Sequence, residues 1–106
     1  MPEADLSQVK RNDDRTRYEL SVDGQLAVSE YNRLTNAVMF THTEVLEALE
    51  GRGVGSVLAR GALDDVRAQG LEVIPLCPFI AAFMRRHKEY QDLLSPVSRR
   101  QFERDA

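Results

Sequence analysis

Residues 49–58 read LEGRGVGSVL, and this glycine-rich stretch separates two parts of the chain with different patterns. Before it, apolar residues alternate with polar ones, which is typical of half-buried strands. After it, apolar residues recur every three or four positions, which is typical of an amphipathic helix. The pattern therefore predicts that a sheet passes into a helix through the loop at Gly51, Gly53 and Gly55.

The residues before the loop predict a meander of antiparallel strands. Apolar and polar residues alternate over 17–22 and lead into Asp23-Gly24, the strongest short signal for a hairpin. A second strand runs on to Tyr31, and a third strand, rich in Val, Phe and Thr, covers 37–45.

The residues after the loop predict a helix, a strand and a second helix. The first helix runs to Gln69, and Gly70 fits its C-terminal stop. Residues 71–76 are nearly all apolar, as expected for a strand buried on both faces. Cys77-Pro78 opens the second helix, and the polar tail from Ser95 is expected to be loosely ordered.

Composition restricts the class of protein. The 106 residues allow one domain, and the net charge of -3 argues against a dedicated nucleic-acid binder. One Cys forms no internal disulfide, and the sequence has no Cys/His cluster for a metal, so we expect no metal and a reducing, cytoplasmic setting. No signal peptide and no apolar run long enough for a membrane are expected.

The glycine loop is a candidate anion site. Glycines allow positive φ and close approach of a ligand, and the first N–H groups of a helix favour phosphate. The spacing GxGxG differs from that of dinucleotide folds, and no Gly-Lys-Ser/Thr follows, so it is not a P-loop. The alternative is a tight turn with no ligand.

The order of these elements, with LEGRGVGSVL at 49–58 and VIPLCPFIAAFMRRHKEY at 73–90, resembles the GCN5-related N-acetyltransferase (GNAT) family. The chain is similar to a small subfamily of minimal domains over residues 17–94. The resemblance implies an α+β fold: an antiparallel meander followed by glycine loop, helix, strand and helix. It divides the chain into a polar arm or first strand (1–16), the N-acetyltransferase-like domain (17–94) and a polar C-terminal tail (95–106).

The resemblance also implies acetyl-CoA, or coenzyme A, as the acyl-donor ligand. Loop amides would hold its pyrophosphate, and the end of the preceding strand would bind the pantetheine arm. The positions so implied are Arg52, Gly53, Val54, Gly55 and Ser56 for the pyrophosphate, and Glu44 and Val45 for the arm. Arg85, Arg86 and Lys88 are either a solvated helix face or contacts for the phosphates.

Three residues are candidates for catalysis. Cys77 precedes a helix N-terminus, where a thiolate is favoured, although a small buried apolar side chain is an equal alternative. The resemblance favours a function for this thiol. His42 is placed by period 2 on the same side as Val38 and Phe40, and either it or Glu44 could accept the proton of an amine. The alternative is an ordinary, partly exposed strand histidine.

The sequence therefore leads to one main hypothesis and two others. The first is an acetyl-CoA-dependent N-acyltransferase with an unidentified amine acceptor. The second is a coenzyme A or acyl-CoA binding module without transferase activity, because the N-terminal helices that line the family's acceptor site are missing. The third is a protein-interaction domain that keeps only the fold. The chain is expected to be a monomer, or a weak homodimer formed through exposed strand edges.

Overall fold

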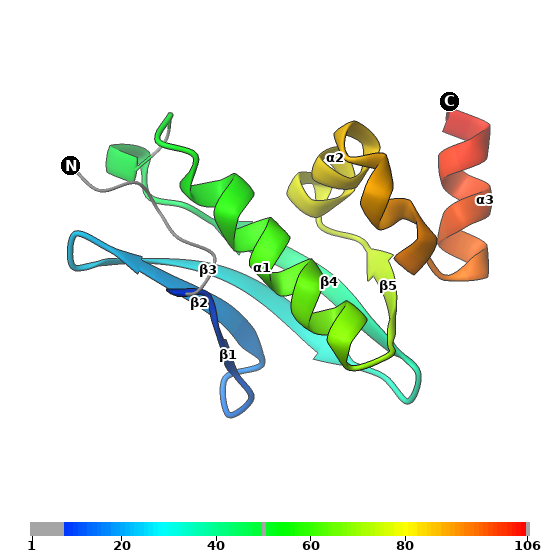
Figure 1. Cartoon of the computed structure of the whole chain (residues 1–106), viewed down its shortest axis with the longest axis horizontal. Helices are drawn as coiled ribbons and strands as arrows, with labels where there is room; N and C mark the ends of the chain where they lie inside the picture. Colours follow the sequence, from blue (N-terminus) through cyan, green and yellow to red (C-terminus); the bar gives the residue numbers. More distant parts are fainter. Residues whose placement is uncertain (1–7, 50, 106) are drawn as a thin grey trace.

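The computed structural model of the chain describes residues 8–49 and 51–105, which form a five-stranded sheet with helices (Figure 1). The sheet has the order β1-β2-β3-β4-β5; the first three pairings are antiparallel and β4 pairs with β5 in parallel. The elements are β1 (Lys10–Asn12), β2 (Arg17–Val22), β3 (Gln25–Arg33), β4 (Ala37–Glu44), the 3₁₀ helix η2 (Glu47–Leu49), α1 (Val54–Ala68), β5 (Glu72–Pro75), α2 (Pro78–Arg86), the 3₁₀ helix η3 (Lys88–Leu93) and α3 (Pro96–Asp105). The predicted α+β meander with loop, helix, strand and helix is confirmed.

The hairpin turn and the end of the first helix lie where the sequence predicts them. Asp23 and Gly24 both have positive φ, 52° and 75°, as a two-residue turn between β2 and β3 requires. At the other end of α1, Gly70 follows the C-cap Gln69 with φ 72°. Glycine adopts this left-handed conformation at no steric cost, so the helix ends there.

Helix α1 packs its apolar stripe against the sheet, on the face that carries Tyr18 and Phe40. The buried side chains of α1 are Val54, Leu58, Ala59, Ala62, Leu63 and Val66. They join the aromatic side chains of the strands and Phe83 of α2 in one core. Full burial of one such large apolar side chain contributes about 1.5–3 kcal/mol.

A bulge interrupts β4 near its end. Glu30 of β3 pairs with His42, but the next residue of β3, Tyr31, pairs with Phe40. Thr41 is therefore an extra residue on β4. A bulge of this kind reverses the alternation of side chains along the rest of the strand.

The reversal places Thr43, not His42, on the face that packs against the helices. Thr43 pairs with the fully buried Ser29, and their side-chain oxygens lie 2.9 Å apart. His42 is exposed, whereas Phe40 is buried. The expectation that His42 shares a side with Val38 and Phe40 is wrong, because period 2 does not account for the extra residue.

Strand β5 is less buried than its apolar sequence predicts. It lies at the edge of the sheet, and only Val73 within it is buried. Leu76, just beyond it, is 61% exposed. Side chains alternate between the two faces of a strand, and those next to Val73 are exposed (Glu72) and half-buried (Ile74), so the expectation of burial on both faces is wrong.

The C-terminal tail also differs from expectation, since most of it is the ordered helix α3. Ser95 begins it: its backbone N–H donates to the carbonyl of Val73, and its hydroxyl oxygen accepts from the N–H of Ser98. The expectation of a loosely ordered tail is wrong, because two contacts hold this polar segment in place. The hydrogen bonds of Ser95 fix the start of the helix, and Phe102 packs against the core. Among the described residues, no helix is long and apolar enough to cross a membrane.

Candidate functional site

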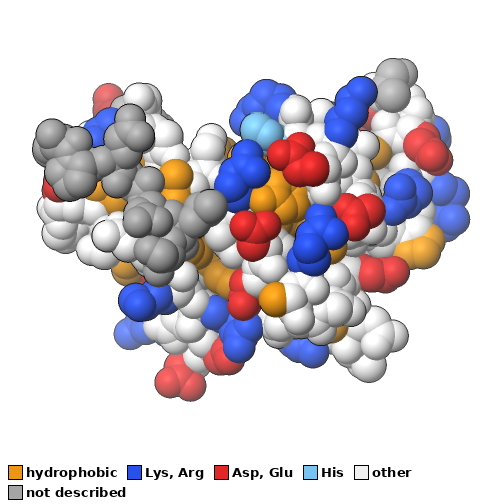
Figure 2. Space-filling model, viewed as in Figure 1, with side chains coloured by type: hydrophobic (Ala, Val, Ile, Leu, Met, Phe, Trp, Pro, Cys, Tyr) orange, Lys and Arg blue, Asp and Glu red, His pale blue; other side chains and the backbone are white. Residues whose placement is uncertain are grey.

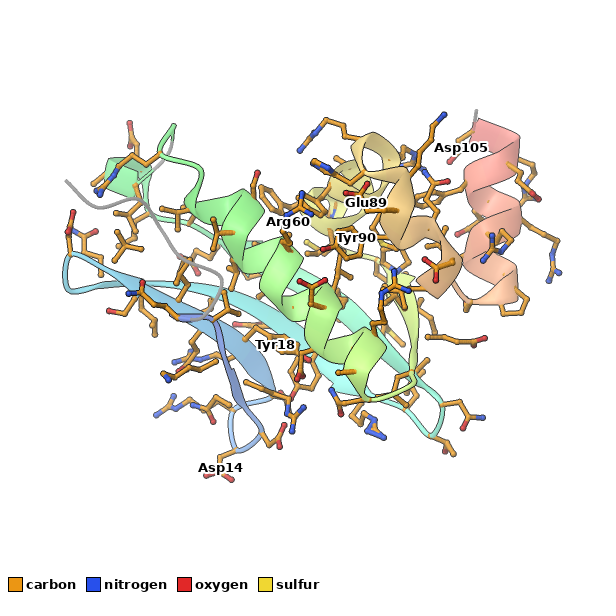
Figure 3. The ribbon with its side chains drawn as sticks, in the orientation of Figure 1. Asp14, Tyr18, Arg60, Glu89, Tyr90 and Asp105 are labelled. Atoms are coloured by element: carbon orange, nitrogen blue, oxygen red, sulfur yellow. The ribbon has the colours of Figure 1, made fainter. Side chains whose placement is uncertain are left out.

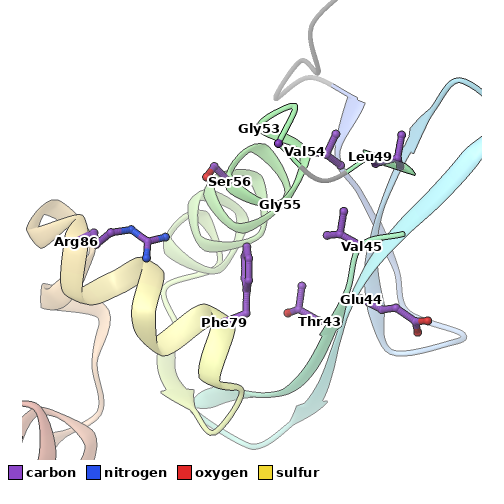
Figure 4. A pocket seen from close by; sticks show the side chains of 11 residues that line it. Thr43, Glu44, Val45, Leu49, Gly53, Val54, Gly55, Ser56, Phe79 and Arg86 are labelled. Atoms are coloured by element: carbon purple, nitrogen blue, oxygen red, sulfur yellow. The ribbon is translucent and has the colours of Figure 1, made fainter. Parts of the chain in front are cut away.

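A groove of about 540 Å³ lies between the end of β4, the glycine loop and α2 (Figure 4). Its walls come from three segments that are distant in the sequence. The lining residues are Thr43, Glu44, Val45, Leu49, Gly51, Gly53, Val54, Gly55, Ser56, Phe79 and Arg86. Six of the residues proposed from the sequence for the coenzyme, and one proposed for catalysis, thus border a single cavity: Val45, Gly53, Val54, Gly55, Ser56 and Arg86, with Glu44.

The loop leaves the first N–H groups of α1 without a cap. Gly51 and Gly53 have φ of 81° and 75°, so the chain turns sharply into the helix. Gly53 is the N-cap residue, and it has no side chain that could accept a hydrogen bond from the first turn. The uncapped N–H groups and the helix dipole together favour a negative ligand at this end of the groove.

Gly55 fits this position because an aromatic ring lies against it. A Cβ atom on Gly55 would lie 2.6 Å from Cζ of Phe79. Figure 4 shows the ring of Phe79 projecting from α2 toward α1. Phe79 was not among the residues predicted from the sequence, because nothing in the local pattern links residue 79 to residue 55.

Arg52 does not line the groove. Its guanidinium donates to the carboxylate of Asp23 at 2.8 Å, in the turn between β2 and β3. This ion pair ties the glycine loop to that hairpin. The glycines of the loop, and not the side chain of Arg52, therefore border the groove.

The two arginines at the end of α2 point to different places. Arg86 borders the groove. Arg85 pairs with Asp105 of α3 at 3.1 Å, and its guanidinium carbon lies 4.2 Å from the centre of the Phe102 ring. The structure thus places Arg86, and not Arg85, at the groove.

The thiol of Cys77 lies behind the wall of the groove. Cys77 is the N-cap of α2 in extended conformation, as the following Pro78 predicts, and it is only 2% exposed. Its thiol donates to Oγ1 of Thr43 at 3.3 Å. Thr43 in turn borders the groove and bonds to Ser29. The partly buried hydroxyl of Thr43 therefore connects Cys77 to the cavity. This connection depends on the β4 bulge and has no signal in the sequence.

His42 and Glu44 lie on the other side of β4. Nε2 of His42 is 3.6 Å from Oε2 of Glu44, and both side chains are more than half exposed. Figure 4 shows the carboxylate of Glu44 directed away from Thr43 and Phe79. The structure thus brings His42 and Glu44 together, but it separates both of them from Cys77.

A second polar cluster, between α1 and η3, is satisfied internally (Figure 3). The guanidinium carbon of Arg60 lies 5.5 Å from the centre of the Tyr90 ring, and its Nη1 lies 3.5 Å from Oε2 of Glu89. The hydroxyl of Tyr90 donates to Asp64 at 2.7 Å. Burial and this hydrogen bond raise the pKa of Tyr90 above its ordinary value. On the face shown in Figure 2, such basic and acidic side chains are interspersed. We interpret this cluster as a structural contact between α1 and η3.

The comparisons with known proteins agree with the fold. The family model described as GCN5-related N-acetyl-transferase matches residues 17–93. The solution structure of a GCN5-like candidate N-acetyltransferase from Staphylococcus aureus superimposes with a TM-score of 0.65 and 24% identity, over 90% of this chain and 91% of that one. The comparison with curated proteins gives no match. The chain therefore belongs to the GCN5-related N-acetyltransferase family, whose members carry out acyl transfer.

Proposed function

We propose that the protein is an N-acyltransferase that uses acetyl-CoA as its donor and an amine as its acceptor. The observation that carries this proposal is the groove, in which the uncapped N-terminus of α1, the end of β4 and Arg86 face one cavity. The N–H groups of Val54, Gly55 and Ser56 would hold the pyrophosphate, and Arg86 would add a positive charge. Charge-assisted hydrogen bonds of this kind are about twice as strong as neutral ones.

The pantetheine arm would lie along the end of β4. Strand β5 ends at Pro75, opposite Phe40, so residues 41–44 have no partner on β5. The backbone groups on this edge are available to an extended ligand, in the way that an added strand pairs with a sheet edge. A chain that follows this edge from the loop runs past Val45 and Thr43 toward Phe79.

Transfer would proceed by direct attack. The amine nitrogen attacks the carbonyl carbon of the thioester, the carbon–sulfur bond breaks, and coenzyme A leaves as a thiolate, which takes up a proton from the protonated base or from water. The amine gives up a proton, which His42 or Glu44 is suited to accept. Glu44 borders the groove and lies 3.6 Å from His42, so the amine would meet the donor at this edge of the groove.

The alternative mechanism of transfer is a covalent route through Cys77. Its thiol would lose a proton and attack the thioester, forming an acetyl-cysteine and free coenzyme A before the amine attacks. The hydrogen bond to Thr43 gives that proton a path toward the groove. This route predicts a mass gain of one acetyl group on Cys77 after incubation with acetyl-CoA.

Calorimetric titration of acetyl-CoA tests the proposal. We expect heat of binding and a rise in the melting temperature, followed by release of coenzyme A when a suitable amine is added. Absence of both heat and thermal stabilisation would remove every coenzyme-dependent function and leave an interaction domain that keeps only the fold.

A binding module without transferase activity is the second candidate. The burial of the candidate nucleophile favours it: Cys77 is buried, and the two candidate bases, His42 and Glu44, have side chains that are more than half exposed. A panel of small amines, peptide lysines and peptide N-termini separates the two functions. Tight binding of acetyl-CoA without turnover of any acceptor would favour the module. A cytoplasmic location and a monomer or weak homodimer remain predictions from the sequence.

A further inference from the structure

The side chain of Arg52 joins the middle of the glycine loop to the hairpin between β2 and β3. Gly51 and Gly53 lie on either side of it, and both have positive φ and border the groove. Arg52 does not border the groove, and its Nη1 lies 2.8 Å from Oδ2 of Asp23. Among residues 51–53 it is the only one with a side chain, so it alone can anchor this stretch through a side-chain contact.

The backbone of this stretch is held weakly. The N–H of Arg52 donates to the carbonyl of Leu49 at 3.4 Å, which is long for a hydrogen bond. Glycine loses more conformational freedom on folding than any other residue, so a loop with two glycines in three positions is costly to order. A side-chain contact at residue 52 therefore restricts a segment that its own backbone leaves mobile.

Asp23 is a firm anchor for this contact. It belongs to the two-residue turn with Gly24, and the turn closes the pair formed by Val22 and Gln25. Val22 and Leu20 of β2 are buried in the core, so the position of the turn is fixed by packing. The side chains of Arg52 and Asp23 are 26% and 44% exposed, so water screens their ion pair only in part.

We propose that Asp23 is a positioning residue for the coenzyme site: through Arg52 it holds the glycine loop in the conformation that directs the first N–H groups of α1 toward the groove. This inference rests on the proposed function, which gives those N–H groups to the pyrophosphate. Asp23 itself does not border the groove. Its effect is that the ligand meets a loop that is already ordered, so less of the binding energy is spent on ordering it.

Asp23→Asn tests the proposal with little change to the turn. Asn-Gly is as favourable as Asp-Gly in a two-residue hairpin turn, so the variant loses the charge and keeps the hairpin. Coenzyme A is titrated into the wild type and the variant by calorimetry at one fixed salt concentration. We expect about three- to fivefold weaker binding in Asp23→Asn, the upper range for an exposed ion pair. Unchanged or tighter binding overturns the proposal.

A double-mutant cycle with Arg52→Gln shows whether the two residues act through each other. Each single variant should weaken the binding of coenzyme A, and the double variant should bind no more weakly than either single one. Arg52→Lys keeps the positive charge and should bind nearly as tightly as the wild type. If Arg52→Gln weakens binding and Asp23→Asn does not, Arg52 acts on the ligand without Asp23, and the proposal is wrong.

Asp92→Asn is the matched control. Asp92 pairs with Arg67 near the other end of α1 at 2.7 Å, and the two side chains are more exposed than those of Asp23 and Arg52. The variant loses one negative charge and one Arg–Asp pair, as Asp23→Asn does, and should bind coenzyme A like the wild type. Equal weakening in both variants would show that the loss does not depend on the loop and would overturn the proposal.

Amide hydrogen exchange measures the order of the loop without any ligand. The N–H groups of Arg52 and Gly53 should exchange faster in Asp23→Asn than in the wild type, because the loop opens more often. They should exchange at the wild-type rate in Asp92→Asn. Equal rates in the wild type and Asp23→Asn would mean that the ion pair does not order the loop, and the proposal would fall.

The outcomes separate this inference from the proposed function. If the wild type does not bind coenzyme A, the proposed function fails and this inference fails with it. If the wild type binds coenzyme A and Asp23→Asn binds it equally well, the proposed function stands and Asp23 does not position the loop.

Discussion

The thiol of Cys77 lies 3.3 Å from Oγ1 of Thr43, and this contact joins the first turn of α2 to the bulged end of β4. The backbone N–H of Cys77 also donates to the carbonyl of Phe40 at 2.9 Å, at the point where the pairing of β4 with β5 stops. Cys77 therefore holds together the two elements that separate to form the groove. Its first role is structural, and any chemistry at its thiol has to pass through Thr43.

Replacing Cys77 by Ala distinguishes direct from covalent transfer. Direct attack predicts that Cys77→Ala still binds acetyl-CoA and transfers its acetyl group, with stability reduced by about 1 kcal/mol through the lost hydrogen bond. Intact mass measurement of the wild type after incubation with acetyl-CoA should show no adduct. An acetyl adduct in the wild type, together with loss of transfer in Cys77→Ala, would instead establish the covalent route.

Gly53→Ala tests the conformation of the loop. Gly53 has φ 75°, and an added Cβ would meet nothing within 4 Å, so the only penalty is the left-handed backbone, roughly 1–2 kcal/mol. Gly70 is a matched control at the other end of α1, with φ 72° and equally open surroundings. Urea unfolding should show similar losses for both Ala variants. Only Gly53→Ala should weaken acetyl-CoA binding; equal weakening by Gly70→Ala would argue against the loop site.

Arg85 and Arg86 form a natural pair of variants on one helix. Arg86→Ala should weaken coenzyme A binding by roughly tenfold or more, because a charge-assisted contact to a phosphate is lost. The same variant should bind with a weaker dependence on salt. Arg85→Ala removes an exposed ion pair with Asp105, worth up to about 1 kcal/mol of stability, and should leave binding unchanged. Calorimetric titration of coenzyme A at low and high salt measures both effects. An equal loss of affinity in the two variants would contradict the assignment of Arg86 to the phosphates.

Buried tyrosines make the protein sensitive to alkali. Burial, followed by the hydrogen bond to Asp13, raises the pKa of Tyr31 from 10 to about 12, and burial with a bond to Asp65 raises the pKa of Tyr18 as well. Between pH 10 and about 12 the unfolded chain loses these protons while the folded chain keeps them, so the free energy of unfolding falls as pH rises. Tyr31→Phe should flatten this fall in urea titrations across that range. A slope as steep as that of the wild type would mean that Tyr31 is not responsible.

Local signals in the sequence were sufficient for much of the fold. Asp23-Gly24 forms the predicted turn, Gly70 ends α1, and Pro78 lies in the first turn of α2. Each of these depends on the backbone preferences of one or two residues, which do not change with tertiary context. The turn from the glycine loop into α1 was predictable for the same reason, and the anion site at this loop stays a prediction.

The side chains of the site were less predictable. One extra residue, Thr41, reverses the faces of β4 and brings Thr43 to the groove in place of His42. The contact between Gly55 and Phe79 joins two helices, and the periodicity of apolar residues in the sequence does not indicate it. Arg85 and Arg86 have the same chemistry, and only the position of α3 separates them. These features arise from packing between distant segments.

The location of bound acetyl-CoA tests the central claim most directly. Backbone amide signals of the 106-residue chain can be followed by ¹H–¹⁵N NMR during a titration with acetyl-CoA. We predict that the largest shifts fall on the N–H groups of Val54, Gly55 and Ser56, with further shifts at Thr43 and Val45. Saturable shifts confined to α3 or to the turn at Asp23, or no shifts at all, would contradict a coenzyme site at the glycine loop.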